Sequence, residues 1–408
     1  MFRPSWSCLA LATSTWLGCA ASAPPPVEAY RLAGVERTPS LAEPEVEPPP
    51  AHVEALPPPA DRLVLITLDG VRWQEIFGGV DPALAREYHL AERSVVDAAT
   101  LTPNLHRAMA SGLSAGGPEG EPMRASGPNF ASLPGYLELL TGEASTCQRN
   151  DCPRTERRTL LDACREAPDT STEGVAMIAS WENLANAATG DEPSFVISAG
   201  RHHGAHRDEM TEDAVLATLL RRGAKAFPPP GQNDYRPDRL TAPLALRYLR
   251  TKAPRCLFVG LGDTDEFAHL GDYGSYLRSL RDADRFVGDV LEAVHDQGDG
   301  GARTTVWITT DHGRADTFVG HGARAPESSR VWLVATGAGV KEERETPFRR
   351  LADVAPVLTR VLGLPAARRL SGVRDGLGGL FSAFACAARR HRPDTARDLA
   401  QRNRQAAW

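Results

Sequence analysis

Five short apolar runs, each of strand length, constrain the fold of this chain more than any other feature. They are rich in β-branched and aromatic residues, as buried parallel strands are. The runs are Arg62–Leu68, Gly174–Ala179, Cys256–Leu261, Thr304–Thr309 and Arg330–Ala335. Helical patterns lie between them, at Thr102–Ala110, Asp208–Arg222, Ala242–Thr251, Tyr273–His295 and Leu351–Leu362. This alternation predicts an α/β sandwich in which helices flank a mostly parallel central sheet.

The region before the first run reads as an export signal followed by a spacer. Residues 1–23 place Arg3 before a short apolar stretch, which is typical of a secretory signal peptide. Residues 16–19 (WLGC) resemble a bacterial lipobox and predict a lipid anchor on Cys19. An ordinary signal cleaved near residues 21–23 is the alternative. We therefore expect an exported protein, either periplasmic or an outer-membrane lipoprotein of a bacterium.

Residues 24–60 differ in composition from the rest of the chain. Eleven of the 32 prolines fall within residues 20–60, together with several glutamates. Such a segment buries too little apolar surface to offset its ordering entropy, so we expect a disordered, extended linker. We expect one catalytic domain at 61–365, with a cap insertion at about 147–230, and a helical tail at 366–408.

Five cysteines lie beyond the predicted signal peptide, and the number is odd. Cys147 and Cys152 are close together in a polar stretch, where a local disulfide is expected in an oxidising compartment. At least one of the five stays unpaired. No CxxC zinc pattern is present.

Carboxylate and imidazole side chains follow three of the predicted strands. Ligands in open α/β sheets bind beyond the carboxyl ends of the strands, so these side chains should meet at one edge of the sheet. They form a mixed set that suits Zn²⁺, and six ligands suffice for two divalent ions. Two such ions suit phosphoryl or sulfuryl transfer, because they stabilise both the entering and the leaving oxygen. The six side chains are Asp69, Asp265, His269, Asp311, His312 and His321.

A candidate nucleophile lies in the segment NFASLPGYLELLTG, residues 129–142. Ser132 would begin a helix that runs to Thr141, with Pro134 in its first turn. The N-terminus of a helix favours anions and would stabilise both a serine alkoxide and a phosphoryl group. The alternative interpretation makes Ser132 a simple N-cap.

Taken in order, these segments resemble the alkaline phosphatase superfamily of metalloenzymes, and most of all its nucleotide pyrophosphatase/phosphodiesterase-like branch with its bacterial relatives. The segments are RLVLITLDGVRWQEIF, NFASLPGYLELLTG, GDTDEFAHLGDY, TTDHGR and GHG, and the likeness continues to about residue 364. In that family the nucleophile lies two residues before a proline and ten before a glycine. Ser132, Pro134 and Gly142 match this spacing.

The resemblance implies which side chains hold each of two divalent metal ions, with zinc favoured by the three imidazoles. One ion falls to Asp265, His269 and His321, and the other to Asp69, Asp311, His312 and the oxygen of Ser132. It also implies a two-step displacement through a phosphoseryl intermediate. Asp263, close to the first set, is a candidate partner of these ligands.

Two departures from the family pattern bear on the substrate. The related phosphodiesterases place an asparagine directly after the proline to hold the phosphate, whereas this chain has Gly135. Asn129 is our candidate for that catalytic role. Sulfatases need arginine in a C/S-x-P-x-R motif, and Tyr136 stands in its place. The second departure argues against a sulfatase.

The expected function is an exported metal-dependent hydrolase of phosphate mono- or diesters, acting on a small-molecule, lipid or glycan phosphoester. Three alternatives stay open: a membrane-associated phospho-group transferase, a sulfatase-like hydrolase, and a non-catalytic, metal-stabilised surface lipoprotein. The net charge of −6 gives no basic excess, so we expect no nucleic-acid-binding surface. Membrane contact would come from the N-terminal lipid anchor, and the sequence carries no signal for the oligomeric state.

Overall fold

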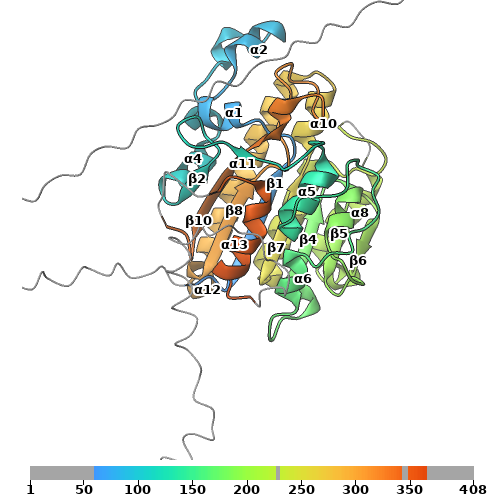
Figure 1. Cartoon of the computed structure of the whole chain (residues 1–408). Helices are drawn as coiled ribbons and strands as arrows, with labels where there is room; N and C mark the ends of the chain where they lie inside the picture. The colour runs from blue at the N-terminus through green and yellow to red at the C-terminus, as the bar shows by residue number, and fades with distance from the viewer. Residues whose placement is uncertain (1–58, 227–229, 342–347, 365–408) are drawn as a thin grey trace, which may run out of the picture. The chain divides into compact units, whose positions relative to one another are not determined.

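The computed structural model describes residues 59–226, 230–341 and 348–364. The predicted signal peptide with its lipobox, nearly all of the linker, and the predicted tail lie outside the described residues. An eight-stranded sheet forms the centre, in the order β2-β10-β8-β1-β7-β4-β5-β6 (Figure 1). Its strands are β1 (Arg62–Leu68), β2 (Leu113–Ala115), β4 (Val175–Ala179), β5 (Val196–Ala199), β6 (His203–Ala205), β7 (Cys256–Leu261), β8 (Thr304–Thr309) and β10 (Leu333–Gly337). A two-stranded sheet joins β3 (Met123–Arg124) to β9 (Arg330–Val331).

The five central strands, β8 to β5 in the sheet order, run parallel. β1 lies between β7 and β8, so that Leu65 is opposite both Phe258 and Trp307. β4 continues the parallel pairing from β7 to β5. At the two edges, β10 runs antiparallel to β8 and to β2, and β6 runs antiparallel to β5. The prediction of a mostly parallel central sheet flanked by helices is confirmed.

Helices lie on both faces of this sheet. The α-helices are α1 (Trp73–Gly78), α2 (Pro82–Glu87), α3 (Ala98–Leu101), α4 (Pro103–Ala110), α5 (Ser132–Thr141), α6 (Leu160–Arg165), α7 (Asp208–Thr211), α8 (Ala214–Lys225), α9 (Asp238–Lys252), α10 (Asp263–His269), α11 (Tyr273–His295), α12 (Asp299–Ala302) and α13 (Val354–Val361). Short 3₁₀ turns occur at Glu92–Ser94, Thr172–Gly174, Glu182–Ala187, Pro326–Ser329 and Leu351–Asp353. None of the helices in the described ranges has the length and apolar character needed to cross a membrane.

Alternation along β1 divides the core into two layers. Successive side chains of a strand point to opposite faces of the sheet. Leu63 and Leu65 pack with residues of α5, α6 and α13, which lie in front of the sheet in Figure 1. Val64 and Ile66 pack with residues of α4, α9 and α11 on the other face. Because both faces are covered, the strand reads as a continuous apolar run and not as an alternating one.

The structure corrects three expectations about the elements. The stretch at about 147–230 supplies β4, β5 and β6 to the central sheet, so the prediction of a cap insertion there is wrong. The last predicted run, Arg330–Ala335, is divided at Trp332 between two sheets. The edge strands β2 and β6 and the four-residue β5 were not predicted, because strands so short leave little periodicity to detect.

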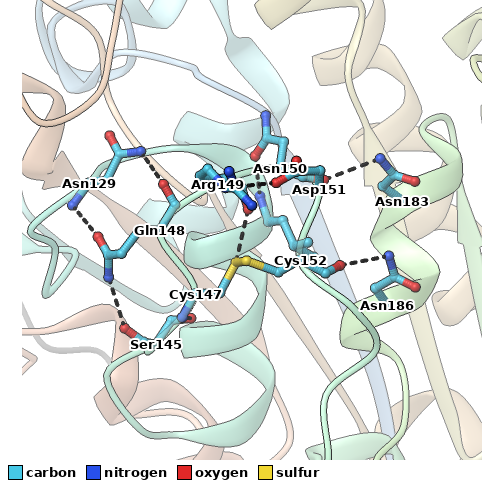
Figure 2. The surroundings of a disulfide bond; sticks show 11 residues. Asn129, Ser145, Cys147, Gln148, Arg149, Asn150, Asp151, Cys152, Asn183 and Asn186 are labelled. Carbon is cyan, nitrogen blue, oxygen red and sulfur yellow. Dashed lines mark hydrogen bonds and ion pairs between the residues drawn. A yellow bond between two sulfur atoms is a disulfide. The ribbon is translucent and has the colours of Figure 1, made fainter.

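Two disulfides join the described cysteines. Cys147–Cys152 is the predicted local bridge (Figure 2). Cys164–Cys256 ties α6 to the first residue of β7, with a Cα–Cα distance of 6.3 Å. A separation of 92 residues gave no sequence signal for this second bridge. The fifth cysteine, Cys386, lies outside the described residues.

The long-range bridge should stabilise the fold more than the local one, because it closes a much longer loop in the unfolded chain. We expect the pair Cys164→Ala/Cys256→Ala to lower the free energy of unfolding by about 2–4 kcal/mol. Urea unfolding followed by circular dichroism measures the change, with Cys147→Ala/Cys152→Ala as the matched control that should cost less. Equal midpoints for the wild type and the Cys164/Cys256 variant would contradict this expectation.

Candidate metal centre

The six predicted ligands lie beyond the carboxyl ends of three adjacent strands. Asp69 directly follows β1, Asp265 and His269 lie on α10 after β7, and Asp311 and His312 come shortly after β8. His321 reaches the same place from the loop that follows. Their ligand atoms form two groups, in each of which all atoms lie within 4.8 Å of one another. The groups are Asp69, Asp311 and His312, and Asp265, His269 and His321.

The first group surrounds Ser132. The Nε2 atom of His312 lies 3.5 Å from Asp69 Oδ1 and 3.4 Å from Asp311 Oδ2. The Oγ atom of Ser132 lies 3.5 Å from Asp69 Oδ1 and 3.3 Å from His312 Nε2. The Nδ1 atom of His312 lies 2.8 Å from the carbonyl oxygen of Gly313, which favours the tautomer that leaves Nε2 free as a ligand.

Burial sets the electrostatics of this first group. It raises the pKa of Asp69 well above its usual range, and the charges of Asp311 and Asp265 raise it further. Burial and the charge of Asp265 likewise raise the pKa of Asp311. Burial, together with His321, lowers the pKa of His312 well below its usual range and keeps its imidazole neutral. Two carboxylates and a neutral imidazole therefore share a site that lacks positive charge of its own.

A divalent metal ion fits this first group. The Oδ2 atom of Asp311 is buried and has no hydrogen-bond partner, although buried polar atoms are nearly always paired. It faces the Nε2 atom of His312, whose lone pair is also available. Carboxylate oxygen and imidazole nitrogen are suitable ligands for zinc and similar ions. A cation here would satisfy the unpaired oxygen and offset the repulsion between the carboxylates.

The second group is more open and includes a cation of the protein itself. The Nε2 atom of His269 lies 3.1 Å from Asp265 Oδ2 and 3.0 Å from the Nε2 atom of His321. The Nδ1 atom of His321 lies 2.8 Å from the carbonyl oxygen of Phe130, which again leaves Nε2 for a ligand role. The Nη1 atom of Arg314 pairs with Asp265 Oδ1, so Oδ2 is the oxygen left for a metal ion.

Arg314 changes the protonation of this second group. Burial opposes ionisation of Asp265, but Arg314 and the two imidazoles hold the pKa of its carboxyl well below the usual range. The hydrogen bond with Asp265 raises the pKa of His269. The side chain of His269 is 45% exposed, whereas His312 is fully buried, so the site opens to solvent on the side of His269.

The two groups adjoin each other through their imidazoles. The rings of His312 and His321 stack with centroids 4.0 Å apart, and those of His321 and His269 are 4.9 Å apart. His321 Nε2 is 3.9 Å from Asp265 Oδ1. A substrate bound at Ser132 would therefore contact both groups.

The helix that carries the candidate nucleophile forms as the sequence predicted, and Ser132 is its first residue. α5 runs from Ser132 to Thr141, and its N-cap is Ala131. The simple N-cap interpretation of Ser132 is therefore wrong. Its hydroxyl points to Asp69 and His312 instead. The side chain of Ser132 is available for chemistry at a helix N-terminus.

Two glycines allow the backbone to approach the site. Gly135 on α5 packs against Asp311, and a Cβ atom there would lie 2.4 Å from the carbonyl oxygen of Asp311. Gly70, with φ +60°, follows Asp69, and a Cβ atom there would lie 2.4 Å from Asp265 Oδ1. Neither position has room for a side chain. The asparagine of related phosphodiesterases is therefore sterically excluded at position 135.

The sequence analysis did not predict the contacts that three residues make at the site. Tyr136 donates its hydroxyl hydrogen to Asp69 Oδ2 at 2.9 Å, and Thr264 donates to the carbonyl oxygen of Asp69 at 2.7 Å. The third is Arg314, the partner of Asp265. The spacing of Tyr136 from Ser132, one helical turn, was the one available signal, because it places both on the same face of α5.

Asn129 lies beside the site with its amide engaged elsewhere. Its Nδ2 atom donates to the carbonyl oxygen of Gln148 at 2.5 Å, and its Oδ1 atom accepts from the backbone of Ala323 at 2.7 Å. These bonds hold two loops together. A catalytic role for Asn129 stays a prediction. Asp263 accepts hydrogen bonds from Tyr235 and the backbone of Asp238, so it serves the junction of α9 and α10 and contacts none of the six ligands.

Comparison with known proteins finds likeness to one superfamily over part of the chain. Residues 241–366 match the family model of the Metalloenzyme superfamily. The chain is 30% identical over 122 residues to a 2,3-bisphosphoglycerate-independent phosphoglycerate mutase from Cereibacter sphaeroides, covering 28% of this chain and 22% of the mutase. It is 31% identical over 124 residues to human GPI ethanolamine phosphate transferase 1, covering 25% of this chain and 13% of the transferase. The chain thus matches less than a quarter of the length of either relative.

Solved structures with the same fold include two from the sulfatases. A 2-O GAG sulfatase superposes with a TM-score of 0.51 and 13% identity, covering 77% of this chain and 73% of that one. A candidate sulfatase from Bacteroides thetaiotaomicron superposes with a TM-score of 0.52 and 12% identity over the same shares of the two chains. At such identities the likeness establishes the fold alone. The chain thus resembles the Metalloenzyme superfamily over residues 241–366 and shares its fold with the two sulfatases.

The hydrogen bond from Tyr136 to Asp69 should tune metal binding. We expect Tyr136→Phe to weaken zinc binding by about 10- to 100-fold, because Asp69 Oδ2 loses its donor and its orientation. Competition with a zinc chelator measures the affinity. Tyr248→Phe is the matched control, because it removes a buried hydroxyl that donates to the carbonyl oxygen of Glu173, away from the site. Equal zinc affinities in the two variants would exclude this role of Tyr136.

Removal of the metal should destabilise the folded protein. An ion that binds only the native state stabilises it by about 2.7 kcal/mol when its free concentration is 100 times the Kd. We expect chelation to lower the melting temperature in calorimetry, and zinc to restore it. The double variant Asp69→Asn/Asp311→Asn leaves only the second group intact, so its melting temperature should respond to zinc less than that of the wild type. A wild-type protein insensitive to chelation would contradict this expectation.

Proposed function

We propose that this protein is a metal-dependent phosphoester hydrolase that cleaves phosphate mono- or diesters through a phosphoseryl intermediate on Ser132. One observation carries the proposal. The Oγ atom of Ser132 lies at the N-terminus of α5 and within 3.5 Å of both Asp69 Oδ1 and His312 Nε2. A nucleophile, a helix N-terminus and two groups of metal ligands thus share one site.

Each group of side chains has a role in the proposed reaction. Asp69, Asp311 and His312 would hold one divalent ion beside Ser132, and Asp265, His269 and His321 a second. Divalent ions bound there supply Lewis acidity, which lowers the pKa of hydroxyl groups and neutralises charge on phosphoryl oxygens. The helix N-terminus and the burial of Ser132, which is 5% exposed, favour the charged transition state further.

The reaction would proceed in two displacements. Ser132 loses its proton to solvent, and its oxygen forms a bond to phosphorus as the bond from phosphorus to the ester oxygen breaks. The released oxygen takes up a proton. A water molecule then attacks the same phosphorus, the bond to Ser132 breaks, and phosphate or a phosphomonoester leaves with the serine hydroxyl restored.

Phosphate is favoured over sulfate as the group transferred. Tyr136 stands where the sulfatase motif has arginine, and its hydroxyl is bonded to Asp69. Sulfatases generate formylglycine from the nucleophile position by means of that motif. The two sequence relatives described above are, moreover, named for phosphate chemistry, a mutase and a phosphate transferase. Both observations support a phosphoester substrate.

A phospho-group transferase is the second candidate, and the local likeness to a GPI ethanolamine phosphate transferase favours it. In that case an acceptor hydroxyl from a lipid or glycan would replace water in the second displacement. The opening on the side of His269 gives such an acceptor access.

Export to an oxidising compartment is supported by the two disulfides. The predicted lipid anchor on Cys19 would place the enzyme at a membrane surface.

The role of Ser132 is tested by Ser132→Ala. We expect this variant to keep its bound metal but to lose turnover of p-nitrophenyl phosphate by at least about 10³-fold. Ser111→Ala, at a distant edge of the sheet, is the control and should behave as the wild type. Mass spectrometry after acid quenching should detect phosphate on Ser132 in the wild type. Wild-type turnover in Ser132→Ala would refute the assignment.

The substrate class is tested by three esters of p-nitrophenol. We expect hydrolysis of the phosphate monoester or of the bis-p-nitrophenyl diester to exceed that of the sulfate ester, because Tyr136 replaces the sulfatase arginine. Added glycerol or ethanolamine tests for transfer by yielding a new phosphoester. Faster turnover of the sulfate would favour the sulfatase alternative. No turnover and no bound metal would favour the non-catalytic lipoprotein.

A further inference from the structure

Phe318 lies between the candidate ligands His312 and His321 and has a backbone conformation that is rare for an aromatic residue. Its φ angle is +69°, in the left-handed region that favours glycine. Five non-glycine residues in the described ranges have positive φ, and Phe318 is the one among them that is buried. A strained backbone persists only where the surrounding contacts over-determine it, and such positions gather at functional sites.

The side chain of Phe318 is enclosed by three tyrosines. Its ring makes edge-to-face contacts with Tyr88, Tyr273 and Tyr276, at centroid distances of 5.6, 5.0 and 5.1 Å. Such pairs stabilise beyond the area that they bury. Tyr273 and Tyr276 belong to α11, and Tyr88 directly follows α2. One buried ring thus anchors the loop between the two histidines to two helices.

Hydrogen bonds fix two of these tyrosines in turn. The hydroxyl groups of Tyr273 and Tyr276 donate to the two carboxylate oxygens of Glu75 on α1, at 2.9 and 3.2 Å. The Nε atom of Arg72 lies 3.2 Å from the same carboxylate, and both Glu75 and Arg72 are buried. α1 and α11 are therefore held together around the ring of Phe318.

The backbone at Phe318 holds Arg314 by two carbonyl groups. The carbonyl oxygens of Phe318 and Val319 accept hydrogen bonds from Nε and Nη2 of Arg314, each at 2.6 Å. In an extended chain successive carbonyl groups point in opposite directions, so both reach one guanidinium because the chain turns at Phe318. The third nitrogen, Nη1, pairs with Asp265 Oδ1. The turn thus fixes the direction in which Arg314 reaches Asp265.

Two of the three candidate ligands in the second group depend on this turn. Arg314 occupies Oδ1 of Asp265 and leaves Oδ2 for a metal ion. The turn is closed by a hydrogen bond from the N–H of Ala315 to the carbonyl oxygen of Gly320 at 2.8 Å. His321 directly follows Gly320. The closed turn therefore sets both the orientation of Asp265 and the place of His321.

We propose that Phe318 is a positioning residue for the second group of metal ligands. Its buried ring holds the strained turn, the turn holds Arg314 on Asp265, and the same turn places His321. This inference rests on one part of the proposed function, namely that the second group binds a divalent ion. Phe318 acts through Arg314 and His321 and does not itself touch metal or substrate.

Phe318→Leu tests this role, because it keeps a buried apolar side chain but loses the ring that the tyrosines enclose. We expect the wild type to bind two zinc ions, and the variant to bind the ion of the second group about 10- to 100-fold more weakly with the first ion unaffected. Chelator competition measures both affinities. His269→Ala, which removes a ligand of the second group, identifies which of the two affinities belongs to that group.

Phe195→Leu is the matched control. It makes the same change at a fully buried ring that directly precedes β5, whereas the ligands lie beyond the carboxyl ends of the strands. Both leucine variants should lower the melting temperature of the metal-free protein, but the control should keep both zinc affinities within about twofold of the wild type. If Phe318 only filled the core, the two variants would behave alike in both measurements.

Phe318→Gly separates the ring from the backbone conformation. Glycine adopts the positive φ without strain but provides no anchor in the tyrosine box. We therefore expect this variant also to bind the second zinc ion more weakly. Phe318→Met, which keeps a large apolar side chain, takes the place of the leucine variant if that variant does not fold, with the same expected result.

The outcomes distinguish this inference from the proposed function. A wild type that binds two zinc ions but hydrolyses no phosphoester overturns the proposed function, and the zinc affinities still decide the role of Phe318. Unchanged zinc affinities in Phe318→Leu overturn that role alone, as does an equal loss in Phe195→Leu. A glycine variant with wild-type affinity for the second ion overturns the role of the ring. A wild type that binds a single ion overturns the inference together with the two-ion site.

Discussion

The convergence of three buried carboxylates at the carboxyl ends of parallel strands is the constraint on which the rest of the site depends. Burial and the neighbouring carboxylates raise the pKa of Asp69 and of Asp311 well above the usual range. Such an arrangement persists only where positive charge balances it. Arg314 balances Asp265, but the other two have only neutral or weakly donating neighbours. A divalent cation beside Ser132 would balance the charge of these two carboxylates.

Close packing against the carboxylates also fixes the position of α5, the helix that begins at Ser132. α5 approaches Asp311 at Gly135 with no space for a side chain, and Tyr136 on the next position bonds to Asp69. The same helix packs with its apolar side chains on the face of the sheet that carries Leu63 and Leu65. Its position is therefore set by the core below and by the carboxylates at its start. These contacts fix the position of α5 and therefore the position of Ser132 at the site.

Much of the fold and most of the candidate site could be predicted from the sequence. The strands that precede the ligands are continuous apolar runs, and the polar residues after them stand out against that background. The bridge Cys164–Cys256 could not be predicted, because it depends on how α6 packs on β7. Arg314 was missed for a related reason, since its role comes from a tertiary contact with Asp265. The prediction of a cap at 147–230 was wrong, because β5 and β6 are too short to be predicted as strands from the sequence pattern.

The two groups of ligands differ in charge and in exposure, and this difference organises the site. Asp69 and Asp311 place two carboxylates around a neutral imidazole in a fully buried position, whereas Asp265 is already paired with Arg314 beside two imidazoles. The first group therefore has no cation of the protein beside its carboxylates, whereas the second has Arg314. The second lies on the solvent side, at the half-exposed His269. The group beside Ser132 is thus enclosed in the core, while the outer group lies on the side that solvent can reach.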